Sequence, residues 1–293
     1  MKYLVTGGAG FIGTNALRYL KRQYPNADLI SFDIAQPKFP VEGVSYVHGD
    51  VRSFLHLRNV VKGADRVFHL AAELGTHETF TYPDTTNEVN LQGTVNLLEL
   101  AKDYGFPLFL ASKPNVWLNP YSISKEAAER YAMMYAQEYK TKVVVLKWFS
   151  VYGPYQYIHK YQKAVPTFIY KALKQEPIPV YGDGKQEADF VFVEDAVIAA
   201  DIAISKRLFG EIIEFGWGKG VEINALVKKI IQLTNSHSEI KYLPMRKGED
   251  LNAKIFANMR KANTLLRYKP TVSLDEGLAR TIAFYKEALH LFP

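Results

Sequence analysis

The sequence predicts an α/β protein with a doubly wound parallel sheet and a smaller C-terminal lobe. Three observations carry this prediction. A glycine-rich turn joins a strand-like run to a helix-like run at the start of the chain, and an acid ends the next strand-like run. Short apolar runs then alternate with amphipathic segments as far as residue 150. Such alternation predicts a parallel sheet covered on both faces, with ligands at the carboxyl ends of its strands.

The chain opens with MKYLVTGGAGFIG, in which Lys2–Thr6 is strand-like, and residues 14–22 read as a helix. Between them Gly7, Gly10 and Gly13 have G-x-x-G-x-x-G spacing. One glycine permits a sharp turn, another lets the backbone approach a ligand, and the third lets helix and strand pack closely. The free N–H groups of the helix's first turn then offer a site for a pyrophosphate. The pattern is typical of a Rossmann-like, dinucleotide-binding fold.

The second strand-like run, Asp28–Asp33, ends in an acid 20 residues after Gly13. A carboxylate at this place accepts hydrogen bonds from ribose hydroxyls and repels a 2′-phosphate. Neither lysine nor arginine occurs at positions 34–36. We therefore predict that the cofactor is NAD rather than NADP.

Further elements follow in order up to residue 150. The predicted strands are Lys2–Thr6, Asp28–Asp33, Val44–Gly49, Arg66–Ala71, Pro107–Ser112 and Lys142–Phe149, and the predicted helices lie near 14–22, 53–62, 86–104 and 122–139. Beyond 150, prolines and a Gly-Asp-Gly sequence indicate a more irregular region. There we expect a strand at Glu211–Phe215 and helices at Val193–Ser205, Asn224–Leu233 and 274–289.

This change of pattern predicts a dinucleotide-binding domain over 1–150 and a smaller lobe over 151–293. Part of the chain after 185 is expected to return to the first domain. The cleft between the two parts is the expected ligand site.

Composition narrows the class of protein. The net charge is +6, but the positive residues form no long run, which argues against nucleic acid and fits an anionic small molecule. The chain has no cysteine, so disulfides, thiolate metal sites and a cysteine nucleophile are excluded. No His, Asp and Glu set has metal-ligand spacing. No apolar run has membrane-spanning length, and we expect a cytoplasmic protein.

Tyr121 and Lys125 begin a strongly helical stretch, and their spacing of four places both on one helix face. A tyrosine that serves as a base near pH 7 needs its pKa lowered from about 10, which takes roughly 4 kcal/mol of phenolate stabilisation. A neighbouring ammonium and a nicotinamide cation both have the right sign. An incidental pair on a surface helix is the alternative. The position shortly after the strand that ends at Ser112 favours catalysis.

Other motifs follow the glycine turn and Asp33 in order: HGDVR (48–52), VFHLAA (67–72), Asn90 with GTVNLLE (93–99), PYSISK (120–125), FSVYGP (149–154) and PVYGDG (179–184). Together they resemble the extended short-chain dehydrogenase/reductase family, in particular its NAD-dependent nucleotide-sugar epimerases and dehydratases, such as UDP-glucose 4-epimerases. The similarity runs from residue 1 to about 285. It implies a Rossmann domain with a smaller nucleotide-sugar-binding lobe. It also implies a homodimer, formed through a four-helix bundle of stretches like 86–104 and 122–139.

The resemblance also implies roles for individual residues. NAD would be bound by Gly7, Gly10, Phe11, Ile12, Gly13, Asp33, Asp50, Val51, Leu70, Ala71, Ala72, Asn90, Phe149 and Val151, together with Tyr121 and Lys125. Lys125 would hold the nicotinamide ribose, and Tyr121 would take the proton from the C4 hydroxyl of the sugar. The nucleotide sugar would contact Glu73, Ser150, Tyr181 and Arg246.

The sequence departs from the family pattern at the catalytic hydroxyl. Aligning Val116 and Trp117 with the family's V-Y-G places Lys113, beside Ser112, where a Ser or Thr is usual. A lysine there can donate to the sugar's O4, and its pKa should fall near Lys125 and the nicotinamide, so it can serve as a base. The alternative is that Lys113 points away and Ser112 fills the role. Tyr121 follows after only eight positions, where the family has a longer loop over the sugar.

The diphosphate contacts depart as well. Ser150 replaces the usual Asn and Ala188 the usual Arg, which leaves Arg246 to pair with the pyrophosphate. Tyr181 remains to pack on a base.

These features favour a nucleotide-sugar 4-epimerase that works through a 4-keto intermediate. A dehydratase, or another 4-keto-forming oxidoreductase, is the first alternative. It is disfavoured because Pro114 and Asn115 stand where 4,6-dehydratases carry acids. The second alternative is a binding protein that has kept the cofactor and lost catalysis, for which Lys113, Ala188 and the short loop are the reasons.

Overall fold

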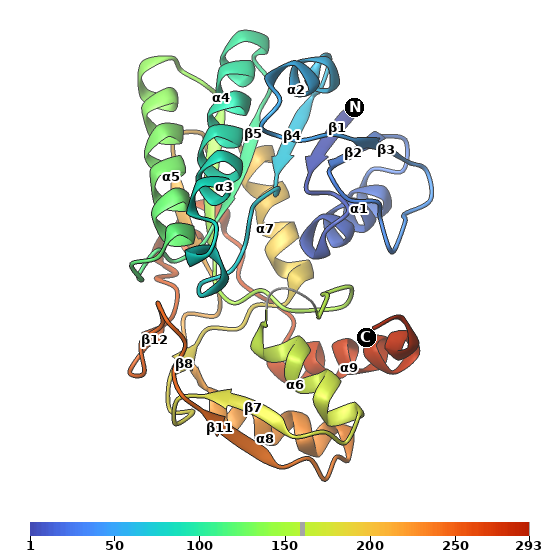
Figure 1. The fold of residues 1–293 in the computed structure, drawn as a ribbon. Helices are drawn as coiled ribbons and strands as arrows, with labels where there is room; N and C mark the ends of the chain where they lie inside the picture. Colours follow the sequence, from blue (N-terminus) through green and yellow to red (C-terminus); the bar gives the residue numbers. More distant parts are fainter. Residues whose placement is uncertain (159–161, 293) are drawn as a thin grey trace.

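The structure, a computed structural model, describes residues 1–158 and 162–292. Its larger part is a seven-stranded sheet in the order β3-β2-β1-β4-β5-β6-β9, with every neighbouring pair parallel (Figure 1). The predicted doubly wound, Rossmann-like sheet is confirmed. The order reverses between β1 and β4, which is where such sheets bind ligands. The strands are β1 (Lys2–Thr6), β2 (Asp28–Asp33), β3 (Val44–His48), β4 (Arg66–His69), β5 (Leu108–Ser112), β6 (Val143–Trp148) and β9 (Ile212–Phe215).

Helices cover both faces of this sheet. Successive residues of β1 point to opposite faces, so Leu4 packs in one apolar core while Tyr3 and Val5 pack in another. One face carries α2 (Phe54–Val61), α4 (Gly93–Tyr104) and α5 (Pro120–Glu138), and the other carries α1 (Phe11–Gln23) and α7 (Val193–Ser205). The short segments η1 (Glu78–Phe80), α3 (Pro83–Asn87) and η2 (Glu88–Gln92) lead into α4.

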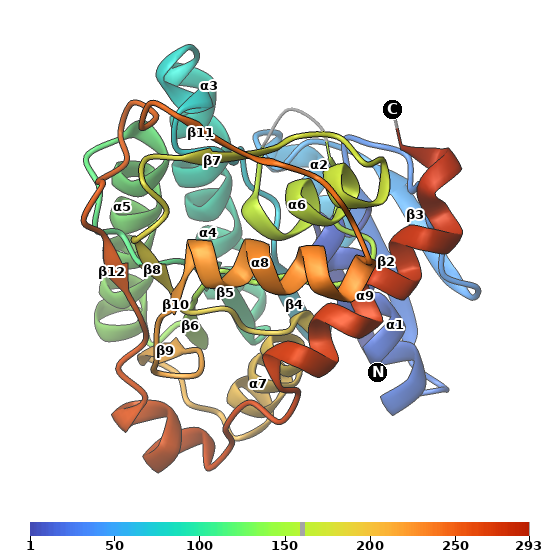
Figure 2. The same cartoon turned by 90° about the horizontal axis from the view of Figure 1, so that it is seen from below.

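The smaller part of the molecule lies beyond the carboxyl edge of the sheet and has an apolar core of its own (Figure 1). Figure 2 shows α6, α8 and α9 together on this side. Helix α6 and the small sheets here were not predicted from the sequence. The strands of these sheets have two to four residues, which is too short for a recognisable periodicity. The elements are α6 (Ala164–Leu173), β7 (Ile178–Tyr181), β8 (Glu187–Ala188), β10 (Val221–Glu222), α8 (Ile223–Thr234), β11 (Ile240–Leu243), β12 (Lys254–Ile255), η3 (Ala262–Leu266), α9 (Leu274–Ala288) and η4 (Leu289–Leu291).

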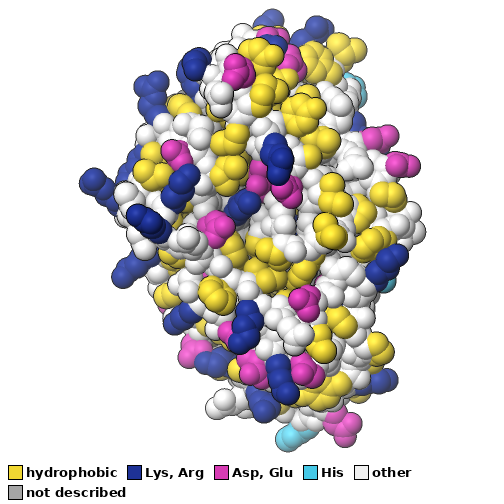
Figure 3. All heavy atoms as spheres, turned by 90° about the vertical axis from the view of Figure 1, so that its left-hand side faces the viewer, with side chains coloured by type: hydrophobic (Ala, Val, Ile, Leu, Met, Phe, Trp, Pro, Cys, Tyr) yellow, Lys and Arg dark blue, Asp and Glu magenta, His cyan; other side chains and the backbone are white. Residues whose placement is uncertain are grey.

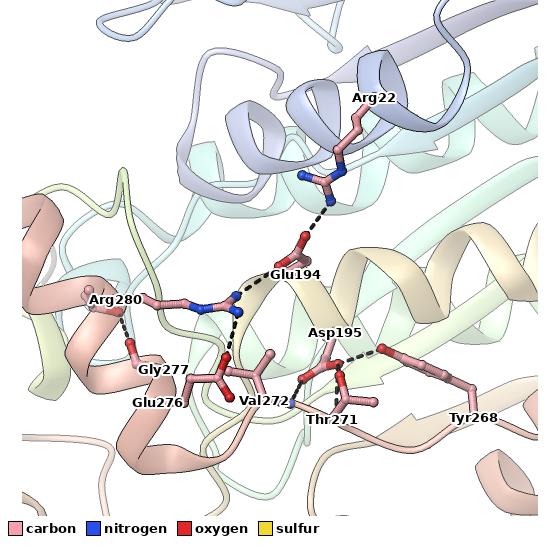
Figure 4. Close-up of polar contacts among 10 residues, drawn as sticks. Arg22, Glu194, Asp195, Tyr268, Thr271, Val272, Glu276, Gly277 and Arg280 are labelled. Carbon is pink, nitrogen blue, oxygen red and sulfur yellow. Dashed lines mark hydrogen bonds and ion pairs between the residues drawn. The ribbon is translucent and has the colours of Figure 1, made fainter.

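Two acids at the start of α7 join the two parts (Figure 4). The buried Asp195 carboxylate accepts hydrogen bonds from the Tyr268 hydroxyl at 2.6 Å, from the Thr271 hydroxyl at 2.8 Å, and from the Thr271 and Val272 amides at 3.0 Å each. Glu194 lies between Arg22 of α1 and Arg280 of α9. Because a buried acceptor with four donors is costly to disrupt, this joint holds the lobe against the sheet.

The described ranges, 1–158 and 162–292, contain neither a membrane-spanning helix nor a metal-binding cluster. No helix there is long and apolar enough to cross a membrane. In the same ranges, no group of three or more His, Cys, Asp or Glu residues could hold a metal ion.

Candidate active site

The glycine turn after β1 packs against neighbouring backbone so closely that Gly7 and Gly13 cannot carry a side chain. Gly7 has φ +71°, and a Cβ on it would lie 2.6 Å from the Ala71 amide nitrogen. A Cβ on Gly13 would lie 2.1 Å from the Gly7 carbonyl oxygen. Helix α1 then starts with Gly10 at its N-cap and no capping side chain, so its first N–H groups stay available. The turn therefore fits a dinucleotide pyrophosphate.

The Asp33 carboxylate is fixed beside this turn. It accepts hydrogen bonds from the Ala9 amide at 3.0 Å and the Ala35 amide at 2.9 Å. Both donors are backbone groups, so the carboxylate is oriented without a neutralising cation. Its place at the end of β2 suits ribose hydroxyls, which supports the fit to NAD.

A cavity of about 390 Å³ lies between the carboxyl edge of the sheet and the lobe. Its sheet end is lined from the ends of β4, β5 and β6 and from α5, and its lobe end from α6, β7, β8 and the 245–255 segment. The predicted site residues that it brings together are Ile12, Leu70, Ala72, Ser112, Lys113, Tyr121, Lys125, Ser150, Val151, Tyr181 and Arg246.

Tyr121 and Lys125 both face this cavity from the first turns of α5. The helix start is well specified, since the Asn119 side chain accepts from the Ser122 amide at 2.8 Å and Pro120 occupies the first turn. Burial raises the pKa of the Tyr121 phenol, so the chain alone does not produce the lowering that catalysis requires. Burial, partly offset by Glu129, lowers the pKa of Lys125 to about 8.

Ser112 and Lys113, at the end of β5, take different partners. The Ser112 hydroxyl donates to the buried Glu129 carboxylate. The Lys113 ammonium instead donates to the Ser122 hydroxyl at 2.7 Å and lies 5.0 Å from the centre of the Tyr121 ring. Burial lowers the pKa of Lys113 to about 7, and the nearby Lys163 ammonium adds to the effect. Of the two residues, Lys113 thus brings a charged donor next to Tyr121.

The lobe end offers one arginine that is already partly neutralised. Arg246 lies 4.7 Å from the centre of the Tyr181 ring, donates to the Gln162 carbonyl at 3.0 Å and pairs with Glu249. Ala188 lines the cavity without a charge. A phosphate at this end would therefore meet Arg246 with its orientation already fixed.

Comparison with known proteins identifies the family. The sequence profile described as the NAD dependent epimerase/dehydratase family matches residues 3–116 and 109–216, which is more than half of the chain. The chain belongs to the NAD dependent epimerase/dehydratase family. The predicted resemblance to the extended short-chain nucleotide-sugar enzymes is thereby confirmed, and the cofactor is NAD.

Individual family members catalyse several reactions. The chain is 30% identical to a UDP-glucuronate 4-epimerase of Thermodesulfobacterium geofontis, over 99% of this chain and 97% of that protein. It is also 30% identical to a UDP-N-acetyl-alpha-D-glucosaminuronate decarboxylase of Bacillus cytotoxicus, over 97% of each. The structure of a dTDP-glucose 4,6-dehydratase from Bacillus anthracis in complex with NAD superimposes with a TM-score of 0.87 at 28% identity, covering 100% of this chain and 98% of that one. The family is therefore established, and the reaction is not.

Some predicted residues lie outside the cavity lining. The Asn90 side chain is buried and binds the backbone of Glu73 and the Ser124 hydroxyl, so it positions the loop after β4. Glu73 does not line the cavity, and neither does Phe149, which is buried. Asp50 forms an ion pair with Arg52 at 2.6 Å, which lowers the pKa of its carboxyl group.

Near Asp50, Val51 is buried under α4, where Asn96 binds its carbonyl at 3.0 Å. Phe11 and Ala71 are half-buried beside the glycine turn, Phe11 as the first residue of α1.

Sequence reasoning missed several cavity residues in this family member. Lys163, at the N-cap of α6, lines the cavity, and burial and the Arg246 charge lower its pKa. Four buried polar side-chain atoms in the lining have no hydrogen-bond partner within the described ranges: Trp148 Nε1, Gln156 Oε1, Thr167 Oγ1 and Gln186 Oε1. No motif marks any of these residues, because they converge only when α6 and β7–β8 fold over the sheet edge.

Proposed function

We propose that this chain is a cytoplasmic, NAD-dependent nucleotide-sugar 4-epimerase that works through a transient 4-keto sugar. The observation that carries the proposal is the arrangement of the cavity. Tyr121, Lys125 and Lys113 meet at its sheet end, and Tyr181 and Arg246 line its lobe end. A nucleotide diphosphate bound at the lobe end would extend its sugar toward Tyr121.

In this arrangement Tyr121 handles the proton of the sugar's C4 oxygen. Its hydroxyl has no hydrogen-bond partner among the described residues, which leaves it available to the substrate. Burial raises the pKa of the phenol, and the Lys113 and Lys125 ammonium groups have the sign that stabilises the phenolate. NAD, when bound, supplies the oxidation of C4 and its reversal. The remaining task of the chain is to hold the sugar while either face of C4 is presented.

The positions of the carboxylates favour epimerisation over dehydration. Among described residues, the carboxylates lining the cavity are Glu187, Glu249 and Asp250, all at the lobe end. Beside Lys113, Pro114 lines the cavity, whereas the Asn115 amide donates to Glu129 at 2.7 Å. Within the described ranges, no carboxylate therefore lines the sheet end of the cavity, where an acid would be needed to protonate a leaving C6 hydroxyl. The 30% identity to a UDP-glucuronate 4-epimerase supports the same choice.

We also propose a homodimer that forms through α4 and α5. Ile123, Tyr131 and Met134 are exposed along one side of α5, at spacings that place them on the same helix face. Figure 3 views the side of the molecule that carries α5, and apolar side chains gather over its upper half. Light scattering should give twice the chain mass for the wild type and a single chain mass for Tyr131→Glu.

The deciding experiment is product analysis. NAD-loaded protein is incubated with UDP-, dTDP-, GDP- and CDP-sugars, and products are separated by chromatography and weighed by mass spectrometry. We expect a C4 epimer of unchanged mass. A product lighter by one water would establish a dehydratase, and one lighter by carbon dioxide a decarboxylase. Binding without turnover across the panel would identify a binding protein.

A further inference from the structure

Lys113, Lys125 and Lys163 line the cavity, and within the described ranges none of the three forms an ion pair with an acid. Glu129, Glu78 and Glu249 act on them from nearby, but burial outweighs these acids and the pKa of each lysine is lowered. In the proposed function, Lys125 holds the cofactor. Lys113 and Lys163 are therefore left for the substrate.

Among the described residues, four charged groups act on Lys113. Lys125 and Glu129 face it from α5, Lys147 from β6 and Lys163 from the start of α6. Glu129 is the only acid in this set, and it is committed elsewhere. It forms an ion pair with Lys147 at 2.9 Å and accepts hydrogen bonds from Ser112 and Asn115. The Lys113 ammonium itself donates only to neutral oxygens, at 2.7 Å to Ser122 and 3.4 Å to Asn115.

The lobe-end acids have other partners, and none of them is among the charged groups that act on Lys113. Glu187 is paired with Lys254 at 2.9 Å and Glu249 with Arg246. Asp250 accepts from the Asn252 amide at 2.9 Å. The charged groups that act on Lys163 are Arg246, Glu78 and Glu249. Because Arg246 lines the lobe end, we assign Lys163 to the diphosphate and Lys113 to the sugar.

We propose that the substrate carries a carboxylate on its hexose, as a nucleotide-linked uronic acid does, and that Lys113 binds this carboxylate. The inference rests on the proposed function of the same cavity. A partly desolvated ammonium with neutral partners gains most from an anion, whereas a neutral hydroxymethyl group would leave its charge uncompensated. Burial and the Lys163 charge lower the pKa of Lys113, as expected for an ammonium group without a paired anion. Lys113 is thus a specificity-determining residue.

The test compares matched sugars that differ only at C6. Dissociation constants of NAD-loaded protein are measured for UDP-glucose and UDP-glucuronate, for dTDP-glucose and dTDP-glucuronate, and for UDP and dTDP alone. We expect the glucuronate of the preferred base to bind on the order of tenfold to a hundredfold more tightly than the glucose, as for a hydrogen bond between charged groups. Lys113→Thr should remove this preference, and Lys113→Arg should keep it.

Two controls separate the possible outcomes. Binding of the free diphosphate should be unchanged in Lys113→Thr, which also shows that the variant is folded. Lys185→Thr removes an exposed lysine outside the cavity and should keep the preference. Equal binding of glucose and glucuronate forms by the wild type would overturn the inference and leave the proposed function standing. Failure of every nucleotide and nucleotide sugar to bind would overturn both.

Discussion

At the end of β1, three glycines let neighbouring backbone segments approach closely, whereas at the end of β5 two side chains decide what the site can hold. The glycine turn depends on backbone geometry, since a Cβ at Gly7 or Gly13 would collide with neighbouring backbone. The β5 end depends on Lys113, whose ammonium lies beside Tyr121 while Ser112 turns to Glu129. Backbone requirements leave little choice of residue, so the cofactor half keeps the family pattern. Side-chain chemistry is free to change, so the sugar end carries what is particular to this protein.

The largest effect should come from the catalytic hydroxyl at the sugar end. Tyr121→Phe should lower kcat by about 10²–10⁴-fold, because general acid–base catalysis at C4 is lost. NAD binding should be unaffected, which separates the chemistry of the sugar end from the cofactor half. The matched control is Tyr131→Phe on the exposed side of the same helix, which should turn over normally. Turnover by Tyr121→Phe at the wild-type rate would contradict the assignment.

The next effect tests the cofactor half. Gly13→Ala places a Cβ 2.1 Å from the Gly7 carbonyl oxygen, and it should lower the free energy of unfolding by about 2–4 kcal/mol. Gly10→Ala meets only the Gly7 carbonyl oxygen, at 3.2 Å, and should change stability little while weakening NAD binding. Thermal unfolding and NAD titration of the two variants give both quantities. Equal stability losses would show that the turn does not depend on close backbone approach.

A smaller effect is expected on the pH dependence of stability, through the Lys113 ammonium. Its pKa of about 7 in the folded protein lies below the ordinary value near 10.4. Between these pH values the unfolded chain binds a proton that the folded chain lacks, so this group's contribution to stability rises with pH. Lys113→Met should therefore exceed the wild type in stability by about 1–3 kcal/mol at pH 6, and this advantage should shrink toward pH 10. Denaturant titrations at both pH values measure the difference.

Exposed Lys185 provides the control for this measurement. Lys185→Met should differ from the wild type by the same amount at pH 6 and at pH 10. A constant difference for Lys113→Met would mean that its ammonium is not held in a desolvated site.

The smallest effect concerns the lobe end. Ala188→Arg introduces an arginine where the family resemblance expects one, near the diphosphate end of the cavity that Arg246 also lines. We expect UDP or dTDP to bind several-fold more tightly, because part of the new charge is screened by solvent and by nearby acids. Calorimetric titration of the free diphosphates checks this. Weaker binding of UDP or dTDP by Ala188→Arg would indicate that the diphosphate needs the space that a small side chain leaves at this position.

The elements of the nucleotide-binding sheet were predictable, and those of the lobe were less so. Strand β1 and helix α7 match their predicted bounds, since β1 leads directly into the glycine turn and α7 is an apolar run of 13 residues. Helix α6 was missed in a region read as irregular, and the lobe's sheets are made of strands of two to four residues. Asn90 is a site residue in the motif, yet its contacts with Glu73 and Ser124 appear only in the folded chain.

By itself, the sequence determined the nucleotide-binding sheet, the NAD-type acid at Asp33 and the Tyr121–Lys125 pair. Each of these depends on spacing within one strand, one turn or one helix, which periodicity and glycine chemistry make readable. Only the tertiary structure decided that Ser112 turns to Glu129 while Lys113 lines the cavity beside Tyr121, and that Lys163 lines the same cavity. These contacts join α5, α6 and two strand ends, and the electrostatic environment of a side chain is set by such neighbours rather than by its place in the sequence.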